Sequence, residues 1–136
     1  MTVVIHHNPA CGTSRNVLAM IRASGEEPVV IEYLKTGWTK PQLLALFAGA
    51  GLTAREALRV GKSPAEDLGL TDPAVSEEAI LEAMIAHPVL VNRPIVVTTK
   101  GIRLCRPSET VLEILENPDI GSFTKEDGDV VGGGKA

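Results

Sequence analysis

Cys11 is the residue of this chain best placed to act as a nucleophile. The apolar run Val3–Ile5 ends shortly before it, and Pro9 rules out helix for Asn8 because the proline ring crowds the preceding residue. From Thr13 onward apolar residues recur at helical spacing, so Cys11 lies at or just before the first turn of a helix. Unpaired amides and the helix dipole stabilise an anion there. A thiol so placed ionises more readily, and the thiolate is the nucleophile.

The residues around Cys11 leave several readings open. Cys11 could instead be a small buried residue that only packs. His7 could tune the thiol as an imidazolium or a hydrogen-bond donor, or it could be a simply hydrogen-bonded residue at a strand end. Ser14 stands where a Cys-x-x-Cys pair would place its second cysteine, so an outside thiol such as glutathione, or Cys105, must resolve any adduct. The strand pattern predicts that Cys105 is packed and inert.

Three arginines could hold an anion beside this sulfur. Arg93 and Arg106 each precede a proline, which stiffens the backbone that carries them. Alone, either would be an ordinary surface charge, but together with Arg59 they suit a tetrahedral oxyanion, because a guanidinium donates two parallel hydrogen bonds. Residues 1–25 and 83–108 contain no Asp or Glu. We therefore expect a positive pocket in a chain that is acidic elsewhere.

The totals bound the class of protein. The 136 residues, 44% of them hydrophobic, predict one globular domain. A net charge of −4 argues against nucleic-acid binding, and no apolar run approaches the ~18 residues of a membrane span. No His, Cys, Asp or Glu cluster has the spacing of a metal site. Two cysteines and a start without a secretory signal favour the cytoplasm.

The elements that must position these residues follow a recognisable order. Strands over Val3–Ile5 and Val29–Ile31 flank the first helix, which ends near Ser24. Capping patterns then predict helices that begin at Thr39, Thr53, Ser63 and Ser76. A hairpin turn over residues 99–101 joins strands over 95–98 and 102–105, and Ser108 caps a last helix.

This order predicts an α/β thioredoxin-like fold, a βαβ–ββα mixed sheet with a helical insertion between its halves. We expect one domain over 1–118 with the insertion at about 39–87, and a tail over 119–136 that is partly packed and then flexible. In that fold a cis-proline faces the cysteine, and Arg93-Pro94 is the candidate bond. Arg93 and the hairpin end at Arg106 would then approach Cys11.

Three motifs resemble a known family. The runs His7–Asn16, Asn92–Thr98 and Arg103–Glu109 resemble the glutathione/glutaredoxin-coupled arsenate reductases, and Phe123–Gly128 looks like that family's C-terminal segment. The resemblance extends from about residue 4 to residue 127.

The resemblance implies a mechanism. Cys11 attacks arsenate as a thiolate, while Arg59, Arg93 and Arg106 hold the oxyanion. His7 is similar to the family's thiolate-tuning histidine. No bound cofactor is implied; glutathione is the co-substrate, and glutaredoxin is the partner that resolves the adduct.

Two other functions stay open on the same scaffold. One is a glutathione-dependent disulfide reductase that uses Cys11 without an oxyanion. The other is a redox-sensing regulator similar to the Spx-type transcription regulators. Those regulators typically carry Cys-x-x-Cys, so Ser14 weighs against that reading.

Overall fold

The computed structural model describes residues 1–131 and divides the chain into two compact units. The first unit joins Met1–Glu32 to the residues from Arg93 onward, and the second is Tyr33–Asn92. The second unit contains all of the predicted insertion at 39–87.

The first unit is built on a four-stranded mixed sheet of order β2-β1-β3-β4. Its strands are β1 (Val4–His7), β2 (Val29–Glu32), β3 (Ile95–Thr98) and β4 (Gly101–Leu104). β1 runs parallel to β2, as the helical crossover α1 (Gly12–Ala23) requires, and β3 is antiparallel to both β1 and β4. The thioredoxin-like fold predicted from the element order is therefore confirmed.

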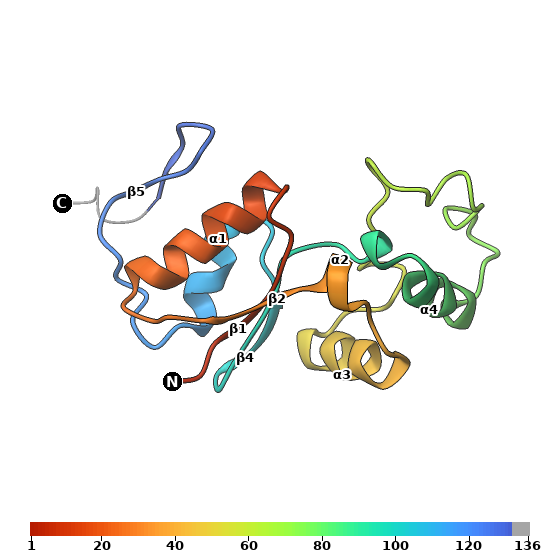
Figure 1. The fold of residues 1–136 in the computed structure, drawn as a ribbon, viewed down its shortest axis with the longest axis horizontal. Helices are drawn as coiled ribbons and strands as arrows, with labels where there is room; N and C mark the ends of the chain where they lie inside the picture. The colour runs from red at the N-terminus through yellow and green to blue at the C-terminus, as the bar shows by residue number, and fades with distance from the viewer. Residues whose placement is uncertain (132–136) are drawn as a thin grey trace. The chain divides into compact units, whose positions relative to one another are not determined.

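One face of this sheet carries the core of the unit. α1 and the 3₁₀ helix η2 (Ser108–Ile114) lie side by side, and both contact the sheet (Figure 1). Apolar residues of α1 at helical spacing pack in one cluster with Ile5 of β1 and Val96 of β3. The buried cluster consists of Val3, Ile5, Val17, Met20, Ile21, Val96, Cys105, Val111, Ile114 and Leu115.

The last predicted helix is shorter and tighter than expected. Ser108 was predicted to cap an α-helix, but it is the first residue of the 3₁₀ helix η2, and Pro107 occupies the cap position without a side-chain hydrogen bond. Of the apolar residues predicted to face inward from this helix, Val111 and Leu115 are buried and Leu112 is partly buried against the same cluster.

A hairpin follows η2 that the sequence reading did not predict. β5 (Phe123–Thr124) pairs antiparallel with β6 (Val130–Val131), shown in blue in Figure 1. Ile120, Phe123 and Val131 pack against the buried cluster of the first unit. The flexible end predicted for the tail falls on residues 132–136, which lie outside the described part of the chain.

The second unit is helical. It contains α2 (Tyr33–Thr36), α3 (Lys40–Ala50), α4 (Glu77–Ala86) and the 3₁₀ turn η1 (Pro88–Leu90). The start predicted for α3 at Thr39 is confirmed, because Thr39 and Gln42 exchange both hydrogen bonds of a capping box. Ser76 likewise caps α4 by accepting from the Ala79 N–H.

The helices predicted at Thr53 and Ser63 do not form. Thr53 and Glu56 exchange capping hydrogen bonds, but the chain makes only a turn there. After Ser63 the chain also makes turns, and Gly69 with φ of 72° takes the left-handed conformation that ends a helical turn. The residues after Thr53 favour a helix by propensity, but an antiparallel bridge between Leu58 and Val91 takes the backbone out of it.

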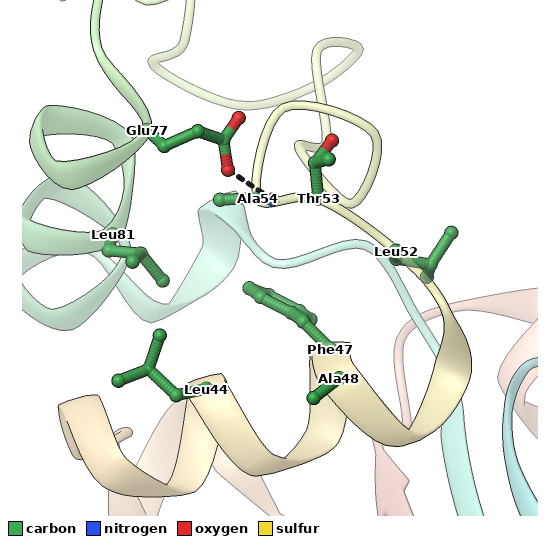
Figure 2. A pocket seen from close by; sticks show the side chains of 8 residues that line it. All are labelled: Leu44, Phe47, Ala48, Leu52, Thr53, Ala54, Glu77 and Leu81. Carbon is green, nitrogen blue, oxygen red and sulfur yellow. Dashed lines mark hydrogen bonds between the residues drawn. The ribbon is translucent and has the colours of Figure 1, made fainter.

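A carboxylate from α4 completes the turn at Thr53. Glu77 accepts from the backbone N–H groups of Ala54 and Arg55 at 2.7 and 3.2 Å. This contact lies at the edge of an apolar pocket that Phe47 and Leu81 help to line (Figure 2). The pocket contains no cysteine or histidine, so it offers none of the chemistry predicted for Cys11.

The capping box of α3 gives a test of this unit's stability. Thr39→Ala removes the acceptor for the Gln42 N–H, so we expect the free energy of unfolding to fall by about 1 kcal/mol. Urea unfolding followed by circular dichroism measures the change. Thr71→Ala, at an exposed threonine of the same unit, is the control. Equal stability of the Thr39 and Thr71 variants would contradict the prediction.

Candidate active site

The loop before α1 delivers Cys11 to the helix start. The Asn8 side-chain oxygen accepts from the Ala10 N–H at 2.9 Å, and the Asn8 carbonyl accepts from the Cys11 N–H at 3.0 Å. Cys11 keeps an extended backbone, with φ of −102° and ψ of 122°, at the cap position of α1. The predicted location of this cysteine is confirmed, and its residue is 7% exposed.

The surroundings of Cys11 favour the thiolate. Burial raises the pKa of the Cys11 thiol, but the backbone N–H of Ser14, the Arg93 guanidinium and the backbone N–H of Thr13 together outweigh it, and the pKa is lowered. The two amides belong to the first turn of α1, where backbone donors have no intrahelical partner. The thiolate that the sequence predicted therefore has donors of the right kind.

Arg93 and Arg106 reach this sulfur because three strand ends meet. His6 near the end of β1 pairs with Ile95 at the start of β3, and Ile95 pairs with Leu104 at the end of β4. Residues just beyond these positions therefore gather at one edge of the sheet. The Arg93-Pro94 bond is cis, as the fold implied, and so is Arg106-Pro107.

Arg106 contacts both Cys11 and Arg93. Its Nη1 atom lies 3.9 Å from the Cys11 sulfur and donates to the Arg93 carbonyl oxygen at 3.2 Å. Arg93 supplies both a hydrogen bond and a Coulomb attraction to the Cys11 sulfur. The structure thus brings together one sulfur and two of the three predicted arginines.

His7 contacts Ser14 in this site. Its Nδ1 atom lies 2.7 Å from the Ser14 hydroxyl oxygen, which also accepts from the Asn8 N–H at 3.1 Å. Burial lowers the pKa of His7, although Glu32 opposes this, so the neutral imidazole is favoured over the imidazolium. The contact with Ser14 agrees with the alternative of a hydrogen-bonded residue at a strand end, and a role of His7 in tuning the Cys11 thiol stays a prediction.

Arg59 belongs to the other compact unit. There its backbone N–H donates to the Leu90 carbonyl at 2.8 Å, and its Nε donates to the Gly61 carbonyl at 2.9 Å. These bonds give its backbone and side chain defined partners within Tyr33–Asn92. Its place beside an oxyanion stays a prediction.

Cys105 is sealed in the core of the first unit. It is fully buried in the apolar cluster, and burial raises the pKa of its thiol to about 12. The prediction that this cysteine is packed is confirmed. A thiol with so high a pKa is a poor nucleophile at neutral pH.

The sequence did not predict the contacts that Asn8, Ser14 and Arg15 make near this site. Asn8 had a recognisable signal, since an asparagine before a proline favours a turn closed by its own side chain. Ser14 was read only as a missing cysteine. The ion pair of Arg15 with Glu126 joins residues 111 positions apart, and no local pattern predicts it.

Other kinds of site find no support within residues 1–131. No group of three or more His, Cys, Asp or Glu side chains there could hold a metal ion. No helix in the same part of the chain is long and apolar enough to cross a membrane.

The fold and the site define a class, the thioredoxin-like proteins with a single cysteine at the start of the first helix. Residues 6–114 match the model of the ArsC family, and the chain belongs to that family. It is 60% identical over 129 residues to an arsenate reductase of Synechocystis sp., covering 95% of this chain and 92% of that one. It is 57% identical to an arsenate reductase of Rhizobium meliloti, covering 99% and 98%.

Solved structures agree with this assignment. The arsenate reductase from Vibrio cholerae superimposes with a TM-score of 0.80 at 42% identity, covering 85% of this chain and 98% of that chain. The resemblance stated from the three motifs is thereby confirmed at the level of the family.

The site predicts selective alkylation. At pH 7 iodoacetamide should modify Cys11 in the folded chain, because a lowered pKa leaves more thiolate, while Cys105 should react only after unfolding. Arg93→Gln should slow the reaction of Cys11 several-fold, because loss of the cation raises the pKa of the thiol. Mass spectrometry of timed samples across pH measures both effects.

Arg22→Gln is the matched control for this experiment. Arg22 lies in the last turn of α1, where it pairs with Glu27. An Arg93 variant that reacts as fast as the Arg22 variant would show that Arg93 does not stabilise the thiolate.

Proposed function

We propose that this chain is an arsenate reductase in which Cys11 is the nucleophile. The observation that carries the proposal is the meeting of a pKa-lowered thiol with the guanidinium groups of Arg93 and Arg106. Relatives at 50–60% identity over nearly the whole chain, named arsenate reductases, support the substrate.

The reaction begins with the oxyanion. Arg93 and Arg106 bind arsenate oxygens through paired N–H donors, which places the arsenic atom beside the Cys11 sulfur. The thiolate attacks arsenic, a sulfur–arsenic bond forms, and an arsenic–oxygen bond breaks as oxygen leaves with solvent protons. Arg59 is proposed as a third oxyanion ligand. His7 acts through Ser14, whose hydroxyl it holds beside the Cys11 loop.

The electrons come from outside the chain. With Ser14 in place of a second cysteine and Cys105 buried, Cys11 has no resolving thiol within residues 1–131. We propose that glutathione adds to the arsenic adduct and that glutaredoxin resolves it. The glutathione sulfur and a glutaredoxin thiol end as a mixed disulfide. The two electrons that they give up reduce As(V) to As(III), which leaves as arsenite. Such thiol chemistry fits a reducing, cytoplasmic setting.

The chemistry also separates arsenate from phosphate. Both are tetrahedral oxyanions of nearly the same shape and charge, so the arginines bind either. Thiols do not reduce phosphate, and it therefore competes without turning over.

Arsenite release tests the function directly. Purified protein with arsenate, glutathione and glutaredoxin should form arsenite, and omission of either thiol component should abolish turnover. Cys11→Ser should fall to the background rate because the sulfur–arsenic bond cannot form. Cys105→Ser is the control and should retain activity if it folds. Full activity of the Cys11 variant would end the proposal, and activity on mixed disulfides alone would favour a disulfide reductase.

Replacement of one arginine by lysine tests how the oxyanion is held. Arg93→Lys keeps the charge but loses the planar pair of donors, so the KM for arsenate should rise at least about tenfold, as loss of a charged hydrogen bond does. Arg59→Lys, measured in parallel, shows whether the third arginine shares this role. Arg22→Lys is the control, and kinetics equal to it would argue against oxyanion binding by the residue tested.

A further inference from the structure

Arg15 uses its side chain in two directions. Its Nε and Nη2 atoms donate to the two carboxylate oxygens of Glu126, each at 2.8 Å. Its Nη1 atom donates to the Pro9 carbonyl oxygen, also at 2.8 Å. The guanidinium therefore connects the C-terminal hairpin to the loop that ends at Cys11.

The hairpin segment that carries Glu126 is itself fixed. The Glu126 backbone N–H donates to the Asn16 side-chain oxygen at 3.0 Å. Lys125 pairs with Glu109 of η2 at 2.7 Å, and Phe123 packs on the core of the first unit. The position of Glu126 is therefore fixed by its own backbone N–H and by the side chain of the neighbouring Lys125.

The pair is charged at neutral pH. The hydrogen bonds from Arg15 lower the pKa of Glu126, and those to Glu126 raise the pKa of Arg15, with a smaller contribution from Cys11. Charge-assisted bonds with two parallel donors fix orientation as well as distance. A cation that lacked the Arg15 Nη1 donor would not make the hydrogen bond to the Pro9 carbonyl oxygen.

We propose that Arg15 is a positioning residue for Cys11: Glu126 fixes the guanidinium, and the guanidinium fixes the Pro9 carbonyl of the cysteine loop. The hairpin then acts as a brace for the nucleophile. We do not assign Arg15 as an oxyanion ligand beside Arg93 and Arg106, because each of its three guanidinium nitrogens already donates to a protein oxygen. The kinetic part of the test rests on the proposed arsenate reduction.

Positioning and simple charge effects predict different signs. If Arg15 and Glu126 acted only as charges, removing the cation would raise the pKa of the Cys11 thiol and removing the carboxylate would lower it. If they act as one brace, the loss of either partner loosens the same loop. Both variants then change the reactivity of Cys11 in the same direction.

The experiment compares Arg15→Gln, Glu126→Gln and the double variant. Each is assayed for the pH dependence of Cys11 alkylation and for kcat and KM with arsenate. We expect each single variant to slow alkylation at pH 7 and to lower kcat by about tenfold, since a misplacement of about 1 Å can cost about a hundredfold. The alkylation rate and kcat of the double variant should fall no further than those of either single variant, because each single substitution already breaks the same interaction.

Glu27→Gln is the matched control. It breaks an exposed arginine–glutamate pair at the far end of the same helix, and it should change neither readout. Faster alkylation of Glu126→Gln, additive losses in the double variant, or losses equal to the control would overturn the brace. If Arg15→Gln does not fold, the direction in which Glu126→Gln changes the alkylation rate of Cys11 decides between the brace and a simple charge effect. A wild-type chain without arsenate reduction overturns the proposed function, while the alkylation comparison still decides the role of Arg15.

Discussion

Stabilisation of a sulfur anion at the start of α1 is the constraint on which this site depends. The first unit contains two buried cysteines, and they differ only in what surrounds them. Cys105 meets apolar side chains, and the pKa of its thiol rises to about 12. Cys11 meets backbone N–H groups and the Arg93 guanidinium, and the pKa of its thiol falls. Since one pKa unit corresponds to about 1.4 kcal/mol, a few well-aimed donors decide which sulfur is reactive.

The thioredoxin-like sheet explains why the arginines lie beside Cys11. Cys11 follows β1, Arg93 precedes β3, and Arg106 follows β4. The antiparallel pairing of β3 with its two neighbours brings these positions to one edge, although both arginines follow Cys11 by more than 80 residues. The chain's net charge of −4 does not oppose this, because the local cations lie within contact range and distant carboxylates are screened.

The sequence predicted features that rest on short-range rules. The strand–turn–helix around Cys11, the capping box of α3, the Ser76 cap of α4 and the order of the sheet follow from apolar periodicity, proline and capping residues. The sequence did not predict features that tertiary contacts determine. The capping pattern at Thr53 closes only a turn, because Leu58 pairs with Val91 in an antiparallel bridge and the flanking backbone groups bond to Leu90 and Asn92. The contact of Arg15 with Glu126 depends on a hairpin that has no strong strand signal.

The burial of Cys105 has a consequence for how electrons pass through the molecule. A chain whose second cysteine is sealed in the core cannot supply two electrons by closing an internal disulfide with Cys11. Under the proposed function, each reduction of arsenate draws its two electrons from thiols outside the chain. If the chain reduces arsenate as proposed, removal of the oxyanion depends on the supply of thiols outside the chain.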